Sequence, residues 1–374
     1  MLKRLPSTLA TLLVVALCSC SDKQEDSASL QQDTEVVLRN KTAELKIDRM
    51  GGAYISFTLN SNPINPLSWI LSKDDMPANN QSGAAFQGHF LCVGRWGSPT
   101  DGEISAGVPH NGEPSRDIWE MVVHNTESLT MKAEAPLDGV SILRKVDFDA
   151  NEAAFLVKET IISNLSHGRL YNHVQHPTLG PPFLKESTIV NSNAGWGFLQ
   201  TNAFPNPEKL EFKWPEARVD SASSSIDLTS SQGDFNYVST HIFNNNQQYG
   251  WITAATSEQN LLIGYIWRLK EYPWLNVWHH SEDNIPVAKG LEFGTTGIGK
   301  SYQDLLNEQT RYRGYNSFEF LDAGEEKEKS FIGFLMPVSN DFKGIEDLTF
   351  QNGTINLYIT GSSTPYSIST DLKL

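Results

Sequence analysis

The feature that most constrains the fold is a period-two alternation of apolar and polar residues, which recurs from residue 35 almost to the C-terminus. In Ala43–Asp48 and Ala53–Leu59, for example, apolar side chains tend to recur at every second position, and a Gly51-Gly52 turn separates the two segments. Successive side chains of a β-strand point to opposite faces, so this period predicts strands with one face in a core. The pattern predicts further strands over 35–38, 128–134, 140–148, 154–162, 170–176, 250–256, 261–268, 275–280, 317–321, 329–336 and 355–360.

Helical signal is scarce by comparison. One short helix is predicted over 300–312, where Tyr302, Leu305 and Leu306 have helical spacing. The sequence therefore predicts an all-β chain, a large antiparallel β-sandwich that forms a single domain over residues 35–374. Segments 60–82 and 204–231 are rich in Pro, Asn and Ser and are expected to be long loops, which commonly build binding faces.

Residues 1–19 are typical of a secretion signal. Lys3 and Arg4 precede an apolar run, Leu9 to Leu17, that is shorter than the roughly 20 residues of a membrane-spanning helix. The run leads into Leu-Cys-Ser-Cys at 17–20, which resembles the lipobox of bacterial lipoproteins and implies cleavage before Cys20 and acylation of its thiol. An ordinary signal peptide is the alternative.

Residues 20–34 are polar and lack aromatic side chains, which predicts a flexible tether. We therefore expect an exported domain that is lipid-anchored in a bacterial cell envelope, in the periplasm or at the cell surface. By analogy with lipoprotein sorting, Ser21 after the cysteine favours the outer membrane. The anchor would be the domain's contact with the membrane.

The composition narrows the choice of partners. A net charge of −15 argues against nucleic acid and against anionic polymers or lipid surfaces. The 9 Trp, 18 Phe and 11 Tyr supply ample apolar surface for a packed core. If Cys18 leaves with the signal and Cys20 is acylated, Cys92 remains alone, so no internal disulfide is expected.

Two polar residues stand out in the first half of the chain. Arg95 follows an apolar strand and is flanked by Gly94, so its planar guanidinium is a candidate for binding sugar hydroxyls. His110 lies in a turn-rich loop, Pro109 to Pro114. Each has an ordinary alternative, a strand-end arginine paired with a carboxylate and a solvated loop histidine.

Two further candidates lie on predicted strands. Alternation puts His173 and His176 on opposite faces of one strand, so they cannot both line one cleft. His176 is the better candidate because it stands at the predicted strand end, before a Pro-rich turn. Glu292 lies between apolar residues on another short strand, where a carboxylate needs a partner or a cleft.

These segments, taken in order, resemble the galactose mutarotase (aldose 1-epimerase) superfamily. The similarity rests on the early Gly51-Gly52 turn, on Gly94-Arg95, on His110-Asn111-Gly112 before Trp119-Glu120, on Gln175-His176 and on Gly290-Leu291-Glu292. The chain departs from the superfamily pattern at Gln175, at Pro177-Thr178 and at Phe293-Gly294. The position of a substrate-binding aspartate stays open, with Asp283 as a possibility.

The resemblance implies a carbohydrate-active isomerase that interconverts sugar anomers by ring opening. Glu292 would take the proton of the anomeric hydroxyl and His176 would protonate the ring oxygen. For these roles we expect an ionised carboxylate and a charged imidazole, with mutual proximity raising the pKa of the histidine and lowering that of the glutamate. Arg95 and His110 would hold hydroxyls, and Trp278 is one of three tryptophans, with Trp96 and Trp274, that are candidates for stacking on a sugar ring.

The chemistry requires no metal and no cofactor. His279 and His280 are adjacent on a predicted strand and point to opposite faces, which argues against joint metal binding. A carbohydrate-binding lipoprotein without turnover on the same fold is the main alternative function. A polysaccharide lyase or hydrolase is disfavoured because no additional helical domain is evident, and an envelope interaction module would leave the four polar candidates unexplained.

Overall fold

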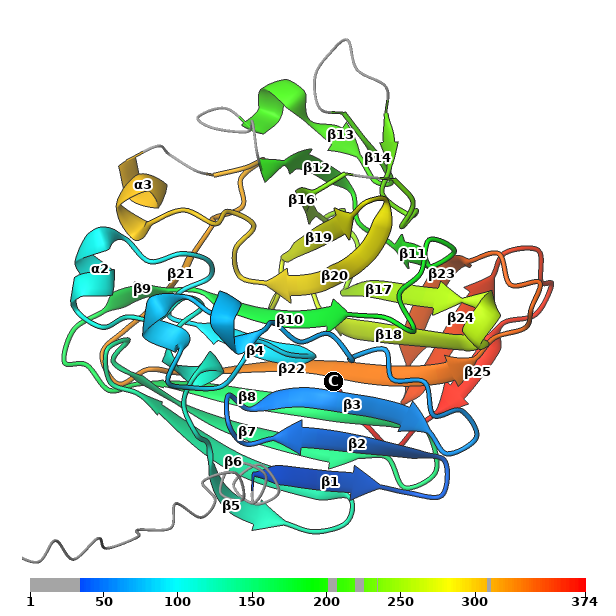
Figure 1. The fold of residues 1–374 in the computed structure, drawn as a ribbon, viewed down its shortest axis with the longest axis horizontal. Helices are drawn as coiled ribbons and strands as arrows, with labels where there is room; N and C mark the ends of the chain where they lie inside the picture. Colours follow the sequence, from blue (N-terminus) through cyan, green and yellow to red (C-terminus); the bar gives the residue numbers. More distant parts are fainter. Residues whose placement is uncertain (1–33, 201–206, 219–224, 234, 308–310) are drawn as a thin grey trace, which may run out of the picture. The chain divides into compact units, whose positions relative to one another are not determined.

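Two antiparallel sheets dominate the unit Glu35–Leu374 of the computed structural model, which describes residues 34–200, 207–218, 225–233, 235–307 and 311–374. The predicted signal at 1–19, Cys20 and the tether up to residue 33 lie outside the described residues. This architecture confirms the prediction of an all-β chain built as a large antiparallel β-sandwich (Figure 1).

The first sheet has ten strands and carries the surface on which the site is built. In spatial order they are β1 (Glu35–Arg39), β2 (Ala43–Asp48), β3 (Ala53–Leu59), β4 (His89–Val93), β10 (His173–Leu179), β20 (Ile285–Gly294), β19 (Trp274–Glu282), β16 (Tyr237–Ile242), β12 (Trp196–Leu199) and β13 (Phe212–Lys213).

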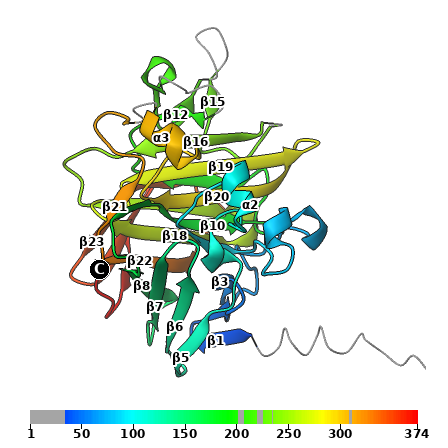
Figure 2. The ribbon, with the colours of Figure 1, turned by 90° about the vertical axis from the view of Figure 1, so that its left-hand side faces the viewer.

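The second sheet has eight strands and covers one face of the first. In spatial order they are β11 (Ile189–Ser192), β17 (Tyr249–Thr256), β18 (Leu261–Arg268), β22 (Glu326–Pro337), β8 (Ala154–Ser163), β7 (Val140–Phe148), β6 (Ser128–Ala135) and β5 (Glu120–His124). The edge strands β1 and β5 lie side by side, and Arg39 N donates to Thr126 O there (Figures 1 and 2).

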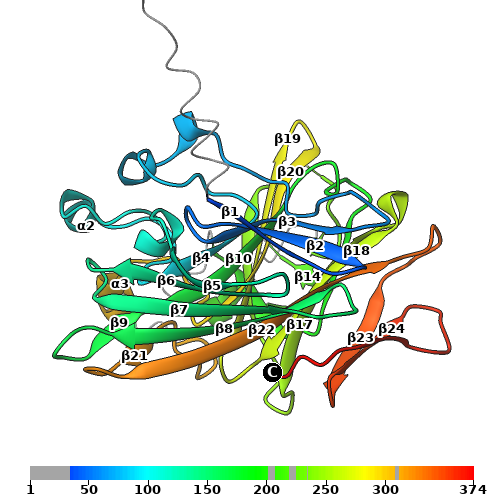
Figure 3. The ribbon, with the colours of Figure 1, turned by 90° about the horizontal axis from the view of Figure 1, so that it is seen from below.

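Three small sheets complete the strands. They are β14 (Glu216–Ala217) with β15 (Ile226–Asp227), β9 (Arg169–Tyr171) with β21 (Glu319–Leu321), and β23 (Ile345–Gln351), β24 (Thr354–Ile359) and β25 (Tyr366–Ser369). The three-stranded sheet packs against β11 and β17 outside the sandwich (Figure 3). It buries its own cluster, in which Ile355 and Leu357 lie with Trp251 and Ile266 of the second sheet.

The main core lies between the two large sheets. Phe57 of the first sheet meets Phe155 of the second edge to face, with ring centroids 5.1 Å apart. Both side chains are fully buried, as are Leu45 and Tyr265 in the same cluster. Burying a side chain of this size stabilises the fold by about 1.5–3 kcal/mol. The alternation seen in the sequence is thus the signature of strands that face this core on one side.

The Gly51-Gly52 turn between β2 and β3 requires glycine at both positions. Both residues have positive φ, 79° and 62°. A Cβ on Gly52 would lie 2.6 Å from the indole of Trp119, and one on Gly51 would lie 2.7 Å from Ser115 O. The turn therefore packs directly against the segment that leads into β5.

Helices are few among the described residues. They are α2 (Asp101–Ser105), α3 (Tyr302–Asn307) and short 3-10 turns at Lys73–Asp75, Ala78–Asn80, Glu113–Ser115, Pro207–Leu210 and Ser257–Gln259. The helix predicted over 300–312 is present as α3 but is shorter. In the described ranges no helix is long and apolar enough to cross a bilayer.

One strand prediction is wrong. The segment 170–176 is not a single strand, because β9 pairs with β21 whereas β10 pairs with β4 and β20. Asn172 separates the two and is buried. The loop expected over 204–231 also contains the short strands β13, β14 and β15 in its described parts.

Candidate functional site

A pocket opens on the face of the ten-stranded sheet that points away from the second sheet. Its volume is about 500 Å³, which is within the usual range for small-molecule sites. Its floor comes from β4, β10, β20, β19 and β16, the central strands of that sheet. The lining consists of Trp69, Leu71, Asp75, Pro77, Phe86, Phe90, Trp96, Gly97, Ser98, His110, Asn111, His176, Gln200, Val238, Trp278, Glu292 and Gly299.

His176 and Glu292 meet at this floor. The register of β10 and β20, which pairs Gln175 with Phe293 and Thr178 with Gly290, brings the two side chains beside each other. Nε2 of His176 lies 3.1 Å from Oε1 of Glu292. The side chains are 12% and 3% exposed, so this contact is largely withdrawn from water.

Each member of the pair has a second polar partner. Trp96 Nε1 donates to Glu292 Oε2 at 2.9 Å, and His176 Nδ1 lies 2.9 Å from the hydroxyl oxygen of Thr178. The ring of Phe90 stacks on the imidazole, with centroids 4.2 Å apart and planes 19° apart. Two strands and a loop thus fix the position of both groups.

Gly290 makes room for the carboxylate. A Cβ at this position would lie 2.8 Å from Glu292 Oε1 and 3.2 Å from Cβ of Trp278. A side chain at residue 290 would therefore displace Glu292 from its contact with His176. The lack of space for a side chain at residue 290 explains the glycine in the Gly290-Leu291-Glu292 motif.

The pKa values of Glu292 and His176 are shifted in the directions opposite to those predicted. Burial raises the pKa of Glu292 to about 8, against the opposing effect of the Trp96 N–H. Burial lowers the pKa of His176 to about 3, and the nearby His110 lowers it further. The expectation of an ionised carboxylate and a charged imidazole is wrong, because removal from water disfavours the charged form of each group.

His110 and Trp278 line the same pocket as His176 and Glu292. His110 lies against the ring of Phe86, with centroids 5.9 Å apart, and burial lowers its pKa to about 4. Trp278 meets Trp69 edge to face at 5.6 Å. Trp96 is also at the pocket, whereas Trp274 is fully buried and donates its N–H to Asn316 O.

Arg95 differs from the prediction. Its side chain is 2% exposed and is not among the residues that line the pocket. It donates to Lys300 O at 3.2 Å and forms an ion pair with Glu103 of α2. Gly94, with φ of 80°, turns the chain after β4 so that Trp96 enters the pocket and Arg95 does not. The alternative of an arginine paired with a carboxylate is the one observed.

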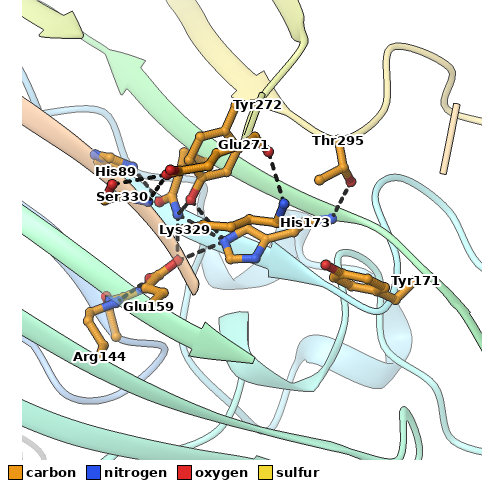
Figure 4. Close-up of polar contacts among 12 residues, drawn as sticks. His89, Arg144, Glu159, Tyr171, His173, Glu271, Tyr272, Thr295, Lys329 and Ser330 are labelled. Atoms are coloured by element: carbon orange, nitrogen blue, oxygen red, sulfur yellow. Dashed lines mark hydrogen bonds and ion pairs between the residues drawn. The ribbon is translucent and has the colours of Figure 1, made fainter. Parts of the chain in front are cut away.

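His173 lies on the opposite face of β10, in a buried polar network (Figure 4). Its Nε2 is 2.7 Å from Oε2 of Glu159, and Gln175 Nε2 donates to the same oxygen at 2.7 Å. Arg144 Nε donates to Glu159 Oε1 at 2.6 Å. The prediction that only one of the two histidines can face a cleft is confirmed.

Several pocket residues could not be predicted from the sequence. Trp69 and Asp75 come from the expected loop at 60–82, and Phe86 from the residues just after it, but no motif marks them. Asp75, rather than Asp283, is the aspartate at the pocket, because Asp283 lies in the turn between β19 and β20. No motif marks Thr178 either, and only its contact with His176 in the structure identifies it as part of the site.

The part of the chain that the structure describes contains no group of three or more His, Cys, Asp or Glu residues placed to hold a metal ion. The polar groups around the His176–Glu292 contact include an indole, a threonine hydroxyl and a second imidazole. Such a site is suited to moving protons.

Comparison with known proteins gives structural relatives but no sequence relatives. No family model and no curated protein matches the chain. A galactose mutarotase related enzyme from Lactobacillus acidophilus superposes with a TM-score of 0.58 at 13% identity, over 83% of this chain and 100% of the other. A candidate aldose 1-epimerase from Escherichia coli K12 gives 0.56 at 11% identity, over 82% and 99%.

A galactose mutarotase-like protein from Lactobacillus casei gives a TM-score of 0.55 at 11% identity, over 81% of this chain and 100% of the other. Likeness at this level of identity concerns the arrangement of the strands. The chain therefore shares the β-sandwich fold of these solved structures.

Proposed function

We propose that this chain is a carbohydrate-active enzyme of the aldose 1-epimerase type, which opens and recloses a sugar ring. The observation that carries the proposal is the 3.1 Å contact between His176 and Glu292 at the floor of an aromatic pocket on this fold. Its substrate would be a free sugar or the reducing end of a glycan.

Ring opening of a hemiacetal needs two proton transfers, one at each oxygen of the anomeric carbon. The anomeric hydroxyl loses a proton while the ring oxygen gains one, and both oxygens are bonded to C1. Two adjacent acid–base groups can serve both oxygens, provided that together they hold one proton. Because burial raises the pKa of Glu292 and lowers the pKa of His176, the pair holds one proton in total at neutral pH.

The walls of the pocket suit a sugar. Trp69, Phe86 and Trp278 offer aromatic faces for the apolar side of a pyranose, while His110, Asn111 and Gln200 offer hydrogen-bonding groups. Ring opening transfers no electrons, so the proposed reaction uses no redox cofactor.

A second candidate function is sugar binding without turnover. It is favoured by the direct contact between the two groups, because Glu292 in its protonated form is not a ready base at neutral pH. In that case the pocket would hold a sugar whose anomers exchange only at the rate of the solution reaction.

Anomer-exchange NMR on a panel of aldoses separates the two functions. We expect exchange with the wild type and a fall of about 10²- to 10⁴-fold for Glu292→Gln and His176→Gln. Exposed residues supply matched controls, Glu346→Gln and His167→Gln, which should keep wild-type exchange. Binding of a sugar without exchange supports the second function, and exchange unaffected by Glu292→Gln contradicts the first.

We also propose that the enzyme works in the cell envelope, held by a lipid on Cys20. The support is the sequence pattern at 17–20 and the polar stretch that follows it. A tether of this kind would keep the pocket at the membrane but outside it.

A further inference from the structure

The charged side chains of the pocket are acidic. Asp75 brings a carboxylate to the wall and Glu292 a carboxyl group to the floor, while no lysine or arginine of the described residues is part of the lining. The two histidines of the lining are neutral at neutral pH, because burial lowers the pKa of His110 to about 4 and that of His176 to about 3. A positively charged ligand would therefore meet no like charge among these side chains.

Asp75 has a carboxylate that is available to a ligand. It is the last residue of the 3-10 turn Lys73–Asp75, and its side chain is exposed at the pocket wall. Within the described parts of the chain, the carboxylate makes no hydrogen bond and no ion pair. A cation could approach it without breaking an existing contact, and opposite charges attract.

Basic residues that are close by in the sequence do not reach the lining. Lys73, two residues before Asp75, donates to Gly83 O. Arg95, next to Trp96, is paired with Glu103. Lys300 has an exposed side chain and is not among the residues that line the pocket. A sugar that carries a phosphate or a carboxylate would thus find no basic side chain in the lining to bind it.

Aromatic rings form much of the wall. Trp69 and Trp278 meet edge to face, with centroids 5.6 Å apart and planes at 86°, so two indoles stand almost at right angles. Phe86 stacks on Phe90 with centroids 5.1 Å apart, and Trp96 also lines the pocket. The face of an aromatic ring attracts a cation, most strongly for tryptophan and more so where water is excluded. Aromatic faces together with a carboxylate suit an ammonium group.

We propose that the pocket selects a sugar that carries an amine, held as an ammonium ion by Asp75 and the aromatic walls, and discriminates against sugars with phosphate or carboxylate groups. The proposal rests on the proposed function, because it names the class of sugar that the same site takes. Asp75 is a binding residue, separate from the His176–Glu292 contact, and ring opening gains no additional covalent step.

Titration with matched sugars tests the selectivity. Glucose and galactose are compared with their 2-amino-2-deoxy forms, with 6-amino-6-deoxyglucose, and with glucose 6-phosphate and glucuronate. At neutral pH and low salt, at least one amino sugar should bind at least about threefold more tightly than its neutral parent, and the anionic sugars should bind more weakly. This preference should shrink as salt rises, because salt screens exposed charges. If no amino sugar binds more tightly than its parent, the proposal is overturned.

Two neighbouring aspartates supply a matched pair of variants. Asp75→Asn should raise Kd for the preferred amino sugar about 2- to 5-fold and leave Kd for its neutral parent almost unchanged. Asp74 is exposed and is not part of the lining, so Asp74→Asn makes the same change in net charge and should keep the wild-type preference. Equal effects of the two variants, or an equal loss of amino and neutral sugars in Asp75→Asn, overturn the role of Asp75.

Binding and anomer exchange are measured separately, which distinguishes failure of this proposal from failure of the proposed function. If amino sugars bind selectively but no sugar exchanges its anomers faster than in solution, the ligand class stands and the epimerase proposal falls. If neutral or anionic sugars exchange faster and bind as tightly as amino sugars, the enzyme stands and the selectivity for an amine is overturned.

Discussion

The guanidinium of Arg95 pairs with the carboxylate of Glu103, eight residues later in the chain, and both groups lie outside the pocket lining. Glu103 also closes the capping box of α2 with Thr100. Arg95 is therefore engaged in holding the segment between β4 and α2. That segment carries Trp96, whose indole contacts Glu292.

Glu103→Gln should lower stability and leave sugar binding almost unchanged. The variant leaves a buried guanidinium without its counter-charge, which we expect to cost about 1–3 kcal/mol of unfolding free energy. Chemical denaturation measures the loss, and the exposed Glu120→Gln is the matched control. A higher KM with unchanged stability would instead mean that Arg95 reaches the sugar.

Trp278→Ala should weaken sugar binding. The indole lines the pocket next to Trp69. Loss of an aromatic contact costs about 0.5–1.5 kcal/mol of binding free energy, which raises Kd about 2- to 12-fold. Titration with a sugar that exchanges in the NMR panel gives the value. Trp214→Ala, outside this pocket, should leave Kd unchanged, and equal effects of the two variants would contradict a role for Trp278 at the site.

Loss of the Glu292 proton should lower the free energy of unfolding as the pH rises. Its pKa is about 8 in the fold against the ordinary 4.5, so the stability contributed by its proton is complete below about pH 4.5 and is lost as the pH rises through about 8. Glu292→Gln keeps a neutral side chain throughout. Between about pH 5 and 8 the wild type should lose up to about 1.4 kcal/mol per pH unit relative to the variant.

Urea unfolding at several pH values measures this difference. The exposed Glu346→Gln should follow the wild type at every pH. His176 acts in the other direction, since its pKa of about 3 lies below 6.5 and its contribution is lost as the pH falls through about 3. A flat difference between wild type and Glu292→Gln from pH 5 to 8 contradicts a buried protonated carboxyl.

Glu159→Gln should be strongly destabilising. The carboxylate accepts from Arg144 and from Gln175 and lies 2.7 Å from His173, with all of these side chains buried. Although burial alone would raise it, the pKa of Glu159 is lowered to about 2 by Arg144 and His173. Loss of the charge leaves Arg144 unpaired in the core, which costs about 3–5 kcal/mol.

The exposed Glu328→Gln on the adjacent strand β22 should change stability by less than about 0.5 kcal/mol. Because the folded pKa of Glu159 is depressed, its contribution is present above about pH 4.5 and is lost as the pH falls toward 2. A similar small effect for both variants in thermal and chemical unfolding would contradict the network's stabilising role.

Much of the fold could be predicted because long strands carry the alternation over many residues. Val140–Phe148 and Leu261–Arg268 begin and end where the pattern predicts. Trp196–Leu199 was missed because four residues are too few to show a period, and Tyr237–Ile242 because its buried Ser239 and His241 break the apolar pattern.

The site was predicted in part for a similar reason. Strand parity assigns His176 and His173 to their faces, and this needs only local geometry. The direction of Arg95 depends on the positive φ of Gly94 and on a carboxylate from α2, which are tertiary features. The protonation of Glu292 depends on how thoroughly distant segments exclude water, and no sequence pattern encodes that.

Cys20→Ala should release the protein from membranes. If the thiol carries the lipid anchor, the variant expressed in a bacterium that makes lipoproteins should move from the membrane fraction to the soluble envelope fraction or keep its uncleaved signal. Mass spectrometry of the mature N-terminus gives the acyl chains directly. Cys92→Ala is the control and should stay with the membrane, and a Cys20→Ala variant that remains there, fully processed, contradicts the anchor.

The two faces of β10 restrict how the length of this strand can change, in evolution or by engineering. His176, Phe90 and Glu292 meet on one side of the sheet, while His173, Gln175 and Glu159 meet on the other. Moving this strand by one residue would send the pocket histidine into the core and the core residues into the pocket. Insertions and deletions can accumulate in the loops around the pocket, but within β10 a single-residue change in length would cost the reaction centre and the core together.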